Sequence, residues 1–506
     1  MKKLIALALG LIMCFSTFSA LADNVISMNI VDTDKQNNDA RYDYIKEKFG
    51  FDLEMVACSL NDIKEKARIW VAGADIPDVL WTDMSTPNFG EMLEWIDSGV
   101  LKPIDISKYP NIQKYQDAIQ SDDALIVDGQ RYFILTLRDN FDKGFMATER
   151  MIYRKDWAKE LGLYNEGDVY TWEEMIEMAK AFVAKDPGKN GAGQTIGLAS
   201  VGWAFPGMAG LQQMSPYWDT FFVKDGQYVW GGNQPETVEA VKMVKRLFDE
   251  GVIWADHALA QTLDGPSKFQ AGQVGILYHN LTPNNIASVT KNLQNAYPDK
   301  DIFDMVGIMN VMSPDGNYFV KQTDEFWGNV SFRYDMDDEL LDKFLSFIDF
   351  TLTPEGRDLI MYGLEGVDFN RAEDGTIECL WEKDEAGQYV SPYQINGDRT
   401  ISIGMLAELA HYTCATDPET VRVIGAEVLW QASQDNLTYR ELNIPFASFN
   451  APNKSKYNMG AEARDKILEL LVNSEDIEKD YLAWVDSVYE SKVQLILDEL
   501  NTGLIK

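Results

Sequence analysis

Apolar and polar residues follow two different periods along the first hundred residues. Val25–Val31 and Phe51–Ala57 show the period of two that is typical of half-buried strands, and Pro77–Trp81 is a short apolar run. Between these strands, Arg41–Phe49 and Asn61–Ala72 carry apolar residues at helical spacing. Alternating strands and helices predict an α/β fold with a mostly parallel, doubly wound sheet, whose ligands bind beyond the carboxyl ends of its strands.

The segment Arg131–Trp157 contains two further strand-like runs, Tyr132–Leu137 and Arg150–Arg154, on either side of a polar loop. A second series of strands and helices begins directly after it. We therefore predict that the chain crosses from a first lobe to a second one here, at about Ile134–Arg138.

The second series carries clear local signals. Thr171 and Glu174 form a capping box for a helix that ends near Asp186, and Asp225-Gly226 is the turn of a hairpin. Strands are expected at Thr195–Ala199, Val274–Tyr278 and Met305–Val311, and helices at Thr237–Asp249, Pro283–Tyr297, Leu340–Leu352, Val421–Ser433, Gly460–Asn473 and Tyr481–Leu500.

The N-terminus has the pattern of a secretory signal peptide. Lys2 and Lys3 precede the apolar run Leu4–Met13, and Ala20-Leu21-Ala22 is a small-residue cleavage site. The run is too short to span a bilayer as a helix. We expect an exported protein, periplasmic or associated with the cell surface, cleaved near Ala22; attachment of a lipid to Cys14 is the alternative.

Composition narrows the function. The chain has a net charge of −35, which argues against nucleic acid and anionic membrane surfaces as partners, although solubility alone explains such a charge. Its cysteines and three histidines show no spacing typical of a disulfide framework, a zinc site or a catalytic triad, so neither a metal nor a cofactor is expected.

Several motifs, in order along most of the chain, resemble those of the family 1 extracellular solute-binding proteins of bacterial ABC importers. The resemblance is greatest to the LplA-like sugar-binding subgroup, and maltose-binding protein is a distant relative. The motifs are Pro77–Trp81, Gly99–Asp105, Tyr132–Ile134, Met151–Trp157, Thr171–Glu174, Phe269–Tyr278, Thr353–Arg357 and Tyr362–Val367.

The resemblance implies two discontinuous doubly wound lobes joined by a hinge of several crossings, the type II fold of periplasmic binding proteins. It places residues 23–137 with about 279–327 in lobe 1 and about 138–278 with about 328–450 in lobe 2. Residues 451–506 would pack on the lobes as helices, and further crossings would lie near Asn280 and Trp327.

One loop departs from the pattern of the family. Relatives often carry a calcium loop here, but Gly188 and Gln194 stand where two of its acids would be. Calcium prefers several anionic or carbonyl oxygens, so we expect no calcium, or weak binding, at Asp186–Gln194.

A sugar site needs aromatic faces for C–H groups and polar groups for hydroxyls. Side chains expected to lie at strand ends or crossings are therefore candidate ligand contacts, each with a plain alternative as a core, capping or solvated residue. They are Asp32, Asp34, Trp81, Asp83, Trp203, Phe205, Tyr278, His279, Asn280, Trp327 and Glu365.

The resemblance implies a binding protein without catalysis, which captures a sugar, with an oligosaccharide favoured, and delivers it to ABC permease subunits. Two alternatives remain open at this point. A secreted polysaccharide hydrolase or lyase could hide a carboxylate pair among 80 acids, although no catalytic motif is present. A surface adhesin or sensor partner could use the same fold.

Overall fold

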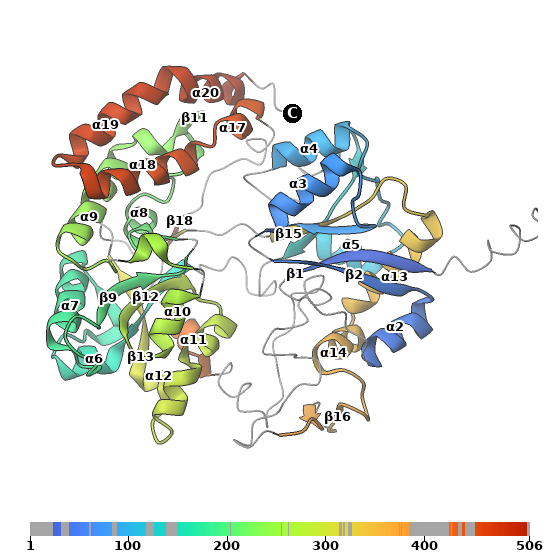
Figure 1. Cartoon of the computed structure of the whole chain (residues 1–506), viewed down its shortest axis with the longest axis horizontal. Helices are drawn as coiled ribbons and strands as arrows, with labels where there is room; N and C mark the ends of the chain where they lie inside the picture. The colour runs from blue at the N-terminus through green and yellow to red at the C-terminus, as the bar shows by residue number, and fades with distance from the viewer. Residues whose placement is uncertain are drawn as a thin grey trace, which may run out of the picture. The chain divides into compact units, whose positions relative to one another are not determined.

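The structure is a computed structural model, drawn in Figure 1. It describes residues 24–31, 40–59, 62–82, 89–117, 126–137, 149–202, 204–254, 256–261, 263–312, 316, 319–321, 326–373, 375, 377–383, 425–426, 428–433, 438–440 and 451–502. Within these residues, no helix has the length and apolar character that a membrane crossing requires. The signal peptide and Cys14 lie outside them.

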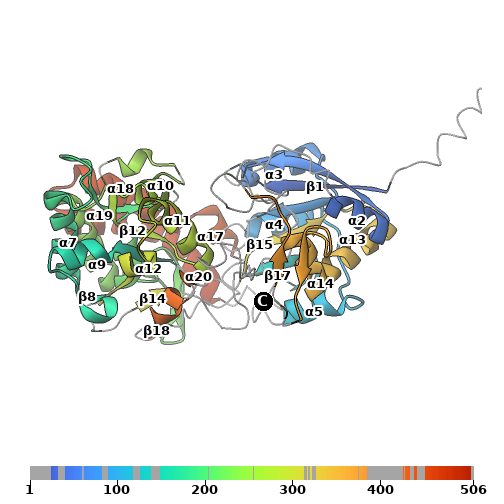
Figure 2. The same ribbon diagram turned by 90° about the horizontal axis from the view of Figure 1, so that it is seen from below.

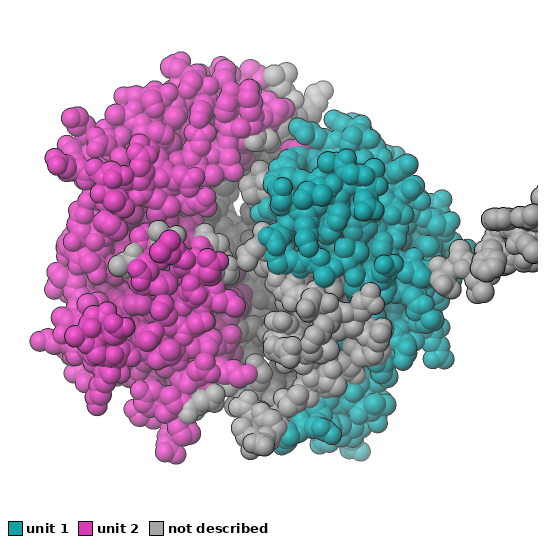
Figure 3. Space-filling model, in the orientation of Figure 1, with its two compact units in different colours: residues 1–85, 91–138, 326–411 teal, residues 86–90, 139–325, 412–506 magenta. Residues whose placement is uncertain are grey.

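The chain forms two compact units, which Figure 3 distinguishes by colour. Unit 1 comprises Met1–Ser85, Glu91–Arg138 and Phe326–His411. Unit 2 comprises Thr86–Gly90, Asp139–Glu325 and Tyr412–Lys506. Each unit has its own five-stranded sheet, so the expectation of two discontinuous α/β lobes is confirmed.

Unit 1 is built on a mixed sheet with the strand order β2-β1-β3-β15-β6. β1 pairs in parallel with β2 and β3, whereas β15 runs antiparallel between β3 and β6. The strands are β1 (Val25–Val31), β2 (Asp52–Cys58), β3 (Val79–Thr82), β6 (Ile134–Leu137) and β15 (Phe326–Phe332). Two small hairpins add β4 (Ile126–Val127) with β5 (Gln130–Arg131) and β16 (Phe369–Arg371) with β17 (Ile377–Cys379).

Helices cover both faces of this sheet, with α3 and α4 on one side and α2, α13 and α14 on the other (Figure 1). Phe51 packs against Phe344 and Phe347 of α13, which fills the core between the sheet and that helix. The helices are α2 (Ala40–Phe49), α3 (Ile63–Gly73), α4 (Phe89–Asp97), α5 (Pro110–Asp117), α13 (Asp338–Thr351) and α14 (Pro354–Tyr362).

Unit 2 is built on a sheet with the strand order β8-β13-β7-β12-β9. β7 runs antiparallel to both of its neighbours, and the outer pairs are parallel. Its strands are β7 (Glu149–Arg154), β8 (Val169–Tyr170), β9 (Ile196–Ser200), β12 (Val274–Asn280) and β13 (Val306–Val311). The hairpin of β10 (Phe221–Lys224) with β11 (Gln227–Trp230) and the pair of β14 (Phe319–Lys321) with β18 (Thr438–Arg440) complete it, the latter pair visible in Figure 2.

Two apolar cores lie on the two faces of the unit 2 sheet. Met151 and Tyr278 belong to one core, and their neighbours Ile152 and Leu277 belong to the other, as the alternation of a strand requires. The helices are α6 (Lys155–Glu160), α7 (Trp172–Lys185), α8 (Met208–Met214), α9 (Pro235–Asp249), α10 (Asp264–Gln270), α11 (Pro283–Ala296), α12 (Ile302–Met305), α17 (Pro452–Lys456), α18 (Met459–Asn473), α19 (Ile477–Val488) and α20 (Gln494–Asn501), with η3 (Glu166–Asp168), η4 (Gly231–Asn233), η5 (His257–Leu259) and the π-helix η7 (Tyr489–Val493).

The expected start of α7 is confirmed in atomic detail. The Thr171 side chain accepts a hydrogen bond from the Glu174 backbone, and the Glu174 carboxylate accepts one from the Thr171 backbone at 2.8 Å. The helix ends at Lys185 and is followed by Asp186, which has the left-handed conformation with φ of 47°. Thr353 likewise caps α14 through the Gly356 N–H.

The division between the lobes differs from the expected one. Residues 279–325 stay in unit 2, because β12 and β13 both pair with β7. Residues 326–411 belong to unit 1, because β15 inserts between β3 and β6. The chain therefore leaves unit 1 near Arg138 and returns at Phe326, close to the expected crossings, but it does not cross at Asn280.

Candidate functional site

The carboxyl ends of the parallel strands in unit 2 meet the start of β7. Asn280, the last residue of β12, pairs with Glu149, the first residue of the antiparallel β7. Asn310, near the end of β13, and Ser200, the last residue of β9, lie at the same edge of the sheet. This is the edge where open α/β sheets bind their ligands.

A polar group lies on one face of this edge, next to α8. The buried Tyr278 hydroxyl lies 3.1 Å from Gln212 Oε1 and 3.4 Å from Glu149 Oε2. Burial raises the pKa of Tyr278 well above its ordinary value, and the negative charges of Glu149 and Asp219 raise it further. The phenol is therefore a neutral hydrogen-bond donor, held between acceptors from α8 and β7.

Two buried polar atoms at this strand end, one on each face of the sheet, have no hydrogen-bond partner. They are Oδ1 of Asn280 and Nδ1 of His279. Burial lowers the pKa of His279 to about 4, so its imidazole is neutral near pH 7. A buried polar atom without a partner costs stability, about 1–3 kcal/mol by mutational data. Such atoms at the ligand-binding edge of a sheet are suited to a ligand that completes their hydrogen bonds.

The opposite face of the same edge is closed by a buried arginine. Arg150 donates hydrogen bonds to Asn310 and to the hydroxyl of Ser433, the latter at 2.6 Å. A further hydrogen bond of 3.2 Å joins the guanidinium to the Ser433 carbonyl oxygen. Arg150 therefore fixes the segment around Ser433 to the sheet and does not share the face of Glu149 and Tyr278.

The strand ends of unit 1 are held by buried amides. Asn29 of β1 accepts a hydrogen bond from the Trp81 backbone N–H at 2.7 Å and donates one to the Trp81 carbonyl oxygen at 2.9 Å. The Trp81 indole is 1% exposed and donates to Thr136 at 3.3 Å. Its ring lies against Gly328, where an added Cβ would come within 2.6 Å of the indole. Trp81 is therefore a core residue of unit 1.

The structure places the other predicted site residues as follows. Phe205 is buried in the same core as Tyr278, whereas Glu365 is exposed after α14 in unit 1. Trp327 lies on β15, but its side chain is not described. Asp32, Asp34, Asp83 and Trp203 lie outside the described residues. Among the described candidates, the structure thus places Tyr278 and Asn280 on one face of the end of β12 and His279 on the other.

Local sequence patterns do not indicate two further residues at this edge, Glu149 and Gln212. Glu149 precedes the predicted strand by one residue, and Gln212 lies in a helix that the sequence analysis did not predict. Leu259 and Leu263 are 80% and 67% exposed. They follow Ile253, which pairs in parallel with Leu198 of β9, and precede Gly265, which packs on the Ser200 carbonyl group. The segment that carries these leucines therefore begins and ends next to β9.

The loop after α7 is organised around the carboxylate of Asp186. It accepts hydrogen bonds from the backbone N–H groups of Asn190 and Gly191, at 2.9 and 2.8 Å, and from the Thr195 hydroxyl at 2.5 Å. These donors lower the pKa of Asp186. In the described part of the chain, no group of three or more His, Cys, Asp or Glu residues is arranged to hold a metal ion.

Comparison with known proteins gives a family match. The model of the family described as bacterial extracellular solute-binding protein matches residues 40–323. A curated relative is the polygalacturonan/rhamnogalacturonan-binding protein YtcQ of Bacillus subtilis (strain 168), 26% identical over 279 residues. The match covers 54% of this chain and 52% of that protein, so the chain spans about half the length of the curated relatives that it matches.

Solved structures share the fold along nearly the whole chain. The Streptococcus pneumoniae ABC-transporter substrate-binding protein FusA, in complex with kestose, is 15% identical with a TM-score of 0.65. That match covers 95% of this chain and 99% of FusA. The alginate-binding protein AlgQ2, solved without calcium ion, is 14% identical with a TM-score of 0.66 and matches 95% of this chain and 98% of its own. These proteins are named as binding proteins and not as enzymes.

Proposed function

Because this chain belongs to the family of bacterial extracellular solute-binding proteins, we propose that it is the exported sugar-binding component of an ABC importer. Its ligand in this proposal is an oligosaccharide, which it delivers to membrane permease subunits. The observation that carries the proposal is the set of buried polar atoms without a partner, on His279 and Asn280, at the carboxyl-end edge of the unit 2 sheet.

The chemistry of this edge supports a sugar. Sugar hydroxyls both donate and accept hydrogen bonds, so they can complete the amide of Asn280 and the imidazole of His279. The exposed leucines Leu259 and Leu263, on the segment between Ile253 and Gly265, offer apolar surface for the C–H faces of a sugar ring. Trp203 and Trp327 stay predictions as aromatic platforms for the same ring faces.

The proposed mechanism is stabilisation of one conformation by the ligand. The conformation that binds the sugar more tightly becomes the dominant one, and the permease subunits recognise that form. Binding must also offset the cost of ordering side chains, so rigid contacts contribute more affinity than flexible ones. In this mechanism the sugar is bound and released unchanged, so incubation of the protein with glycans should yield no cleavage product.

Export by a signal peptide that is cleaved near Ala22 is part of this proposal. Comparing the mass of the protein secreted by its host with that of the full chain tests it. Cleavage at Ala22 gives an unmodified chain that starts at Asp23, whereas lipid attachment to Cys14 gives a heavier, membrane-associated product.

A thermal-shift screen of the mature protein tests the sugar assignment. A ligand that binds only the folded state raises the apparent stability by RT ln(1+[L]/Kd), which is about 2.7 kcal/mol at a hundredfold excess over Kd. We expect oligosaccharides to raise the melting temperature. The proposal fails if every mono- and oligosaccharide leaves it unchanged while peptides or polyols raise it.

A further inference from the structure

We propose that this site selects neutral, hydroxyl-rich sugar units and rejects uronate units, and that the carboxylate of Glu149 determines this choice. The inference rests on the proposed sugar-binding function and adds the charge class of the ligand. It separates this chain from a relative that is named for binding polygalacturonan, a polymer of uronate units.

The edge is rich in hydrogen-bond acceptors. Three groups there present acceptor oxygens: the Glu149 carboxylate, Gln212 Oε1 and Asn280 Oδ1. The hydroxyl proton of Tyr278 is shared with the first two, and Asn280 Oδ1 has no donor. A sugar hydroxyl can donate to these oxygens, whereas an ionised carboxylate offers acceptors alone.

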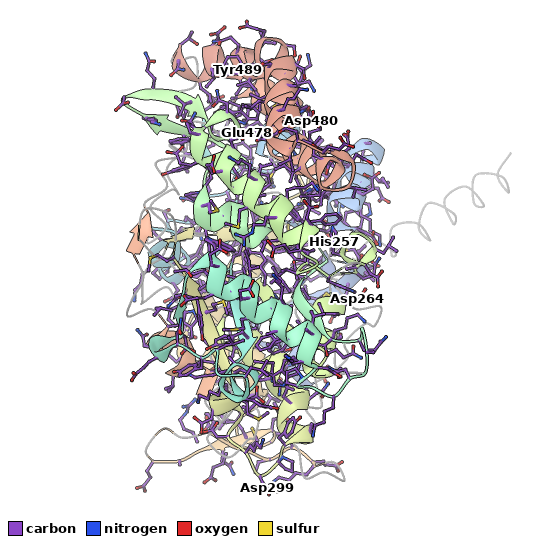
Figure 4. All side chains as sticks on the ribbon, turned by 90° about the vertical axis from the view of Figure 1, so that its left-hand side faces the viewer. His257, Asp264, Asp299, Glu478, Asp480 and Tyr489 are labelled. Atoms are coloured by element: carbon purple, nitrogen blue, oxygen red, sulfur yellow. The ribbon has the colours of Figure 1, made fainter. Side chains whose placement is uncertain are left out.

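The charges around Tyr278 are negative. The charges that act on its pKa are those of Glu149 and Asp219, and both are negative. Carboxylates that face a partly buried site disfavour a further carboxylate, because the desolvated charges repel each other more strongly than they would in water. Figure 4 shows other acids of unit 2, Asp264, Asp299 and Glu478, well separated from one another.

The two arginines of β7 make their hydrogen bonds to other residues. Arg150 binds Asn310 and Ser433 on the opposite face of the sheet. Arg154, at the far end of the strand, donates to Asp156 at 2.8 Å and 2.5 Å. The hydrogen bonds of these two arginines thus hold Asn310, Ser433 and Asp156. Recognition of a uronate would favour an arginine that can donate two hydrogen bonds to its carboxylate.

The test uses two ligands that differ at one position. A galacto-oligosaccharide and an oligogalacturonate of the same length and linkage differ only at C6, which is a hydroxymethyl group in one and a carboxylate in the other. Calorimetric titration of the mature protein should give an affinity at least about tenfold higher for the neutral oligomer, because the ligand carboxylate and the Glu149 carboxylate repel each other. Other neutral and uronate oligomers of matched length extend the comparison.

Variants assign the choice to Glu149. Glu149→Gln keeps the shape of the side chain and removes its charge, so the affinity ratio of neutral to uronate oligomer should fall toward one. Glu236→Gln makes the same change on the exposed first turn of α9 and should leave the ratio as it is in the natural chain. If Glu149→Gln does not fold, raising the salt to about 0.5 M with the natural chain should narrow the ratio instead, since screening weakens the repulsion.

Each outcome decides a different point. Equal or tighter binding of uronates by the natural chain overturns the inference while the sugar-binding function stands. A neutral preference that Glu149→Gln leaves unchanged overturns the role of Glu149. Binding of neither class of glycan, with a peptide or polyol bound instead, overturns the proposed function and the inference with it.

Discussion

Trp81 illustrates how burial separates a core residue from a site residue. The sequence places this tryptophan at a strand end, a position where related solute-binding proteins contact their ligand. In the structure the indole is enclosed by Thr136 and Gly328, and the buried amide of Asn29 holds its backbone. A side chain with 1% exposure has little surface for a sugar, so the role of Trp81 is to pack the core of unit 1.

Trp81→Ala should therefore act on stability. We expect it to lower the free energy of unfolding of unit 1 by about 3–5 kcal/mol, the usual cost of deleting a buried aromatic side chain. Urea unfolding followed by circular dichroism measures this loss. Ile69→Ala removes an apolar side chain that is 60% exposed and should cost less than about 0.5 kcal/mol. Equal losses in the two variants would contradict the assignment of Trp81 to the core.

Trp203 remains the aromatic side chain that the sequence favours as a sugar platform. Trp203→Ala should abolish the ligand-induced rise in melting temperature, because stacking on a ring face is lost, and should leave the unliganded protein folded. Thermal shift with and without the best glycan measures both quantities. A variant that binds that glycan as the natural chain does would remove Trp203 from the site.

His279 should make stability depend on pH. Its pKa is about 4 in the folded chain and near 6.5 when unfolded, so the unfolded state binds more protons between these values. Stability is then fully present above about pH 6.5 and falls as the pH is lowered toward 4, by at most about 3 kcal/mol. Unfolding of the natural chain and of His279→Gln at pH 7, 5.5 and 4.5 should show a smaller loss in the variant. Equal losses would show that the imidazole does not titrate in this way.

At the scale of elements, the loop after α7 shows how a sequence signal acquires a structural reason. Two acids of the family's calcium loop are absent, and the remaining Asp186 has its carboxylate occupied by the N–H groups of Asn190 and Gly191 and by the Thr195 hydroxyl. Asn190 also donates to the Gly272 carbonyl oxygen at 2.9 Å, which fixes the loop to the turn before β12. N–H and hydroxyl donors of the protein thus occupy the carboxylate oxygens that a calcium ion would otherwise bind.

Removal of calcium should therefore leave the protein unchanged. We expect the same melting temperature in excess EDTA and in excess Ca²⁺. Asp186→Ala should lower the melting temperature by the same amount under both conditions, because three donors lose a shared acceptor. A rise in melting temperature with Ca²⁺ that Asp186→Ala abolishes would show that the loop binds the ion.

At the scale of the whole molecule, the C-terminal helices belong to one unit. Ile467 and Leu471 of α18 and Tyr481 of α19 are buried in the core that also contains Tyr278. The Tyr481 hydroxyl donates to the Gly232 carbonyl oxygen at 2.8 Å. The sequence predicts that residues 451–506 pack on the lobes as helices. The described helices of this segment pack in the core of unit 2.

A chain that ends at residue 450 should fail to fold unit 2, since it exposes the apolar residues that α18, α19 and α20 cover. We expect insoluble or rapidly proteolysed protein, as measured by expression and limited trypsin digestion. A control chain that ends at residue 502 should behave as the full chain does. Stable, trypsin-resistant protein ending at residue 450 would contradict the dependence.

Sequence periodicity alone determined most elements of this chain. β1 begins and ends where the alternation does, and the start of α7 follows from Thr171 and Glu174, because strand period and helix caps are set by residues close together in the chain. The resemblance of ordered motifs indicated the two-lobed α/β fold. The same local signals placed Tyr278, His279 and Asn280 at the end of one strand.

Only the tertiary structure decided which lobe each later strand joins. β12 and β15 have similar local patterns, but pairing with β7 or with β3 depends on residues more than a hundred positions away. Burial has the same origin, since the assembled sheets leave Trp81 1% exposed and Leu259 80% exposed. Glu149 became a candidate because an antiparallel partner brings its carboxylate to the end of β12, and no local pattern carries that information.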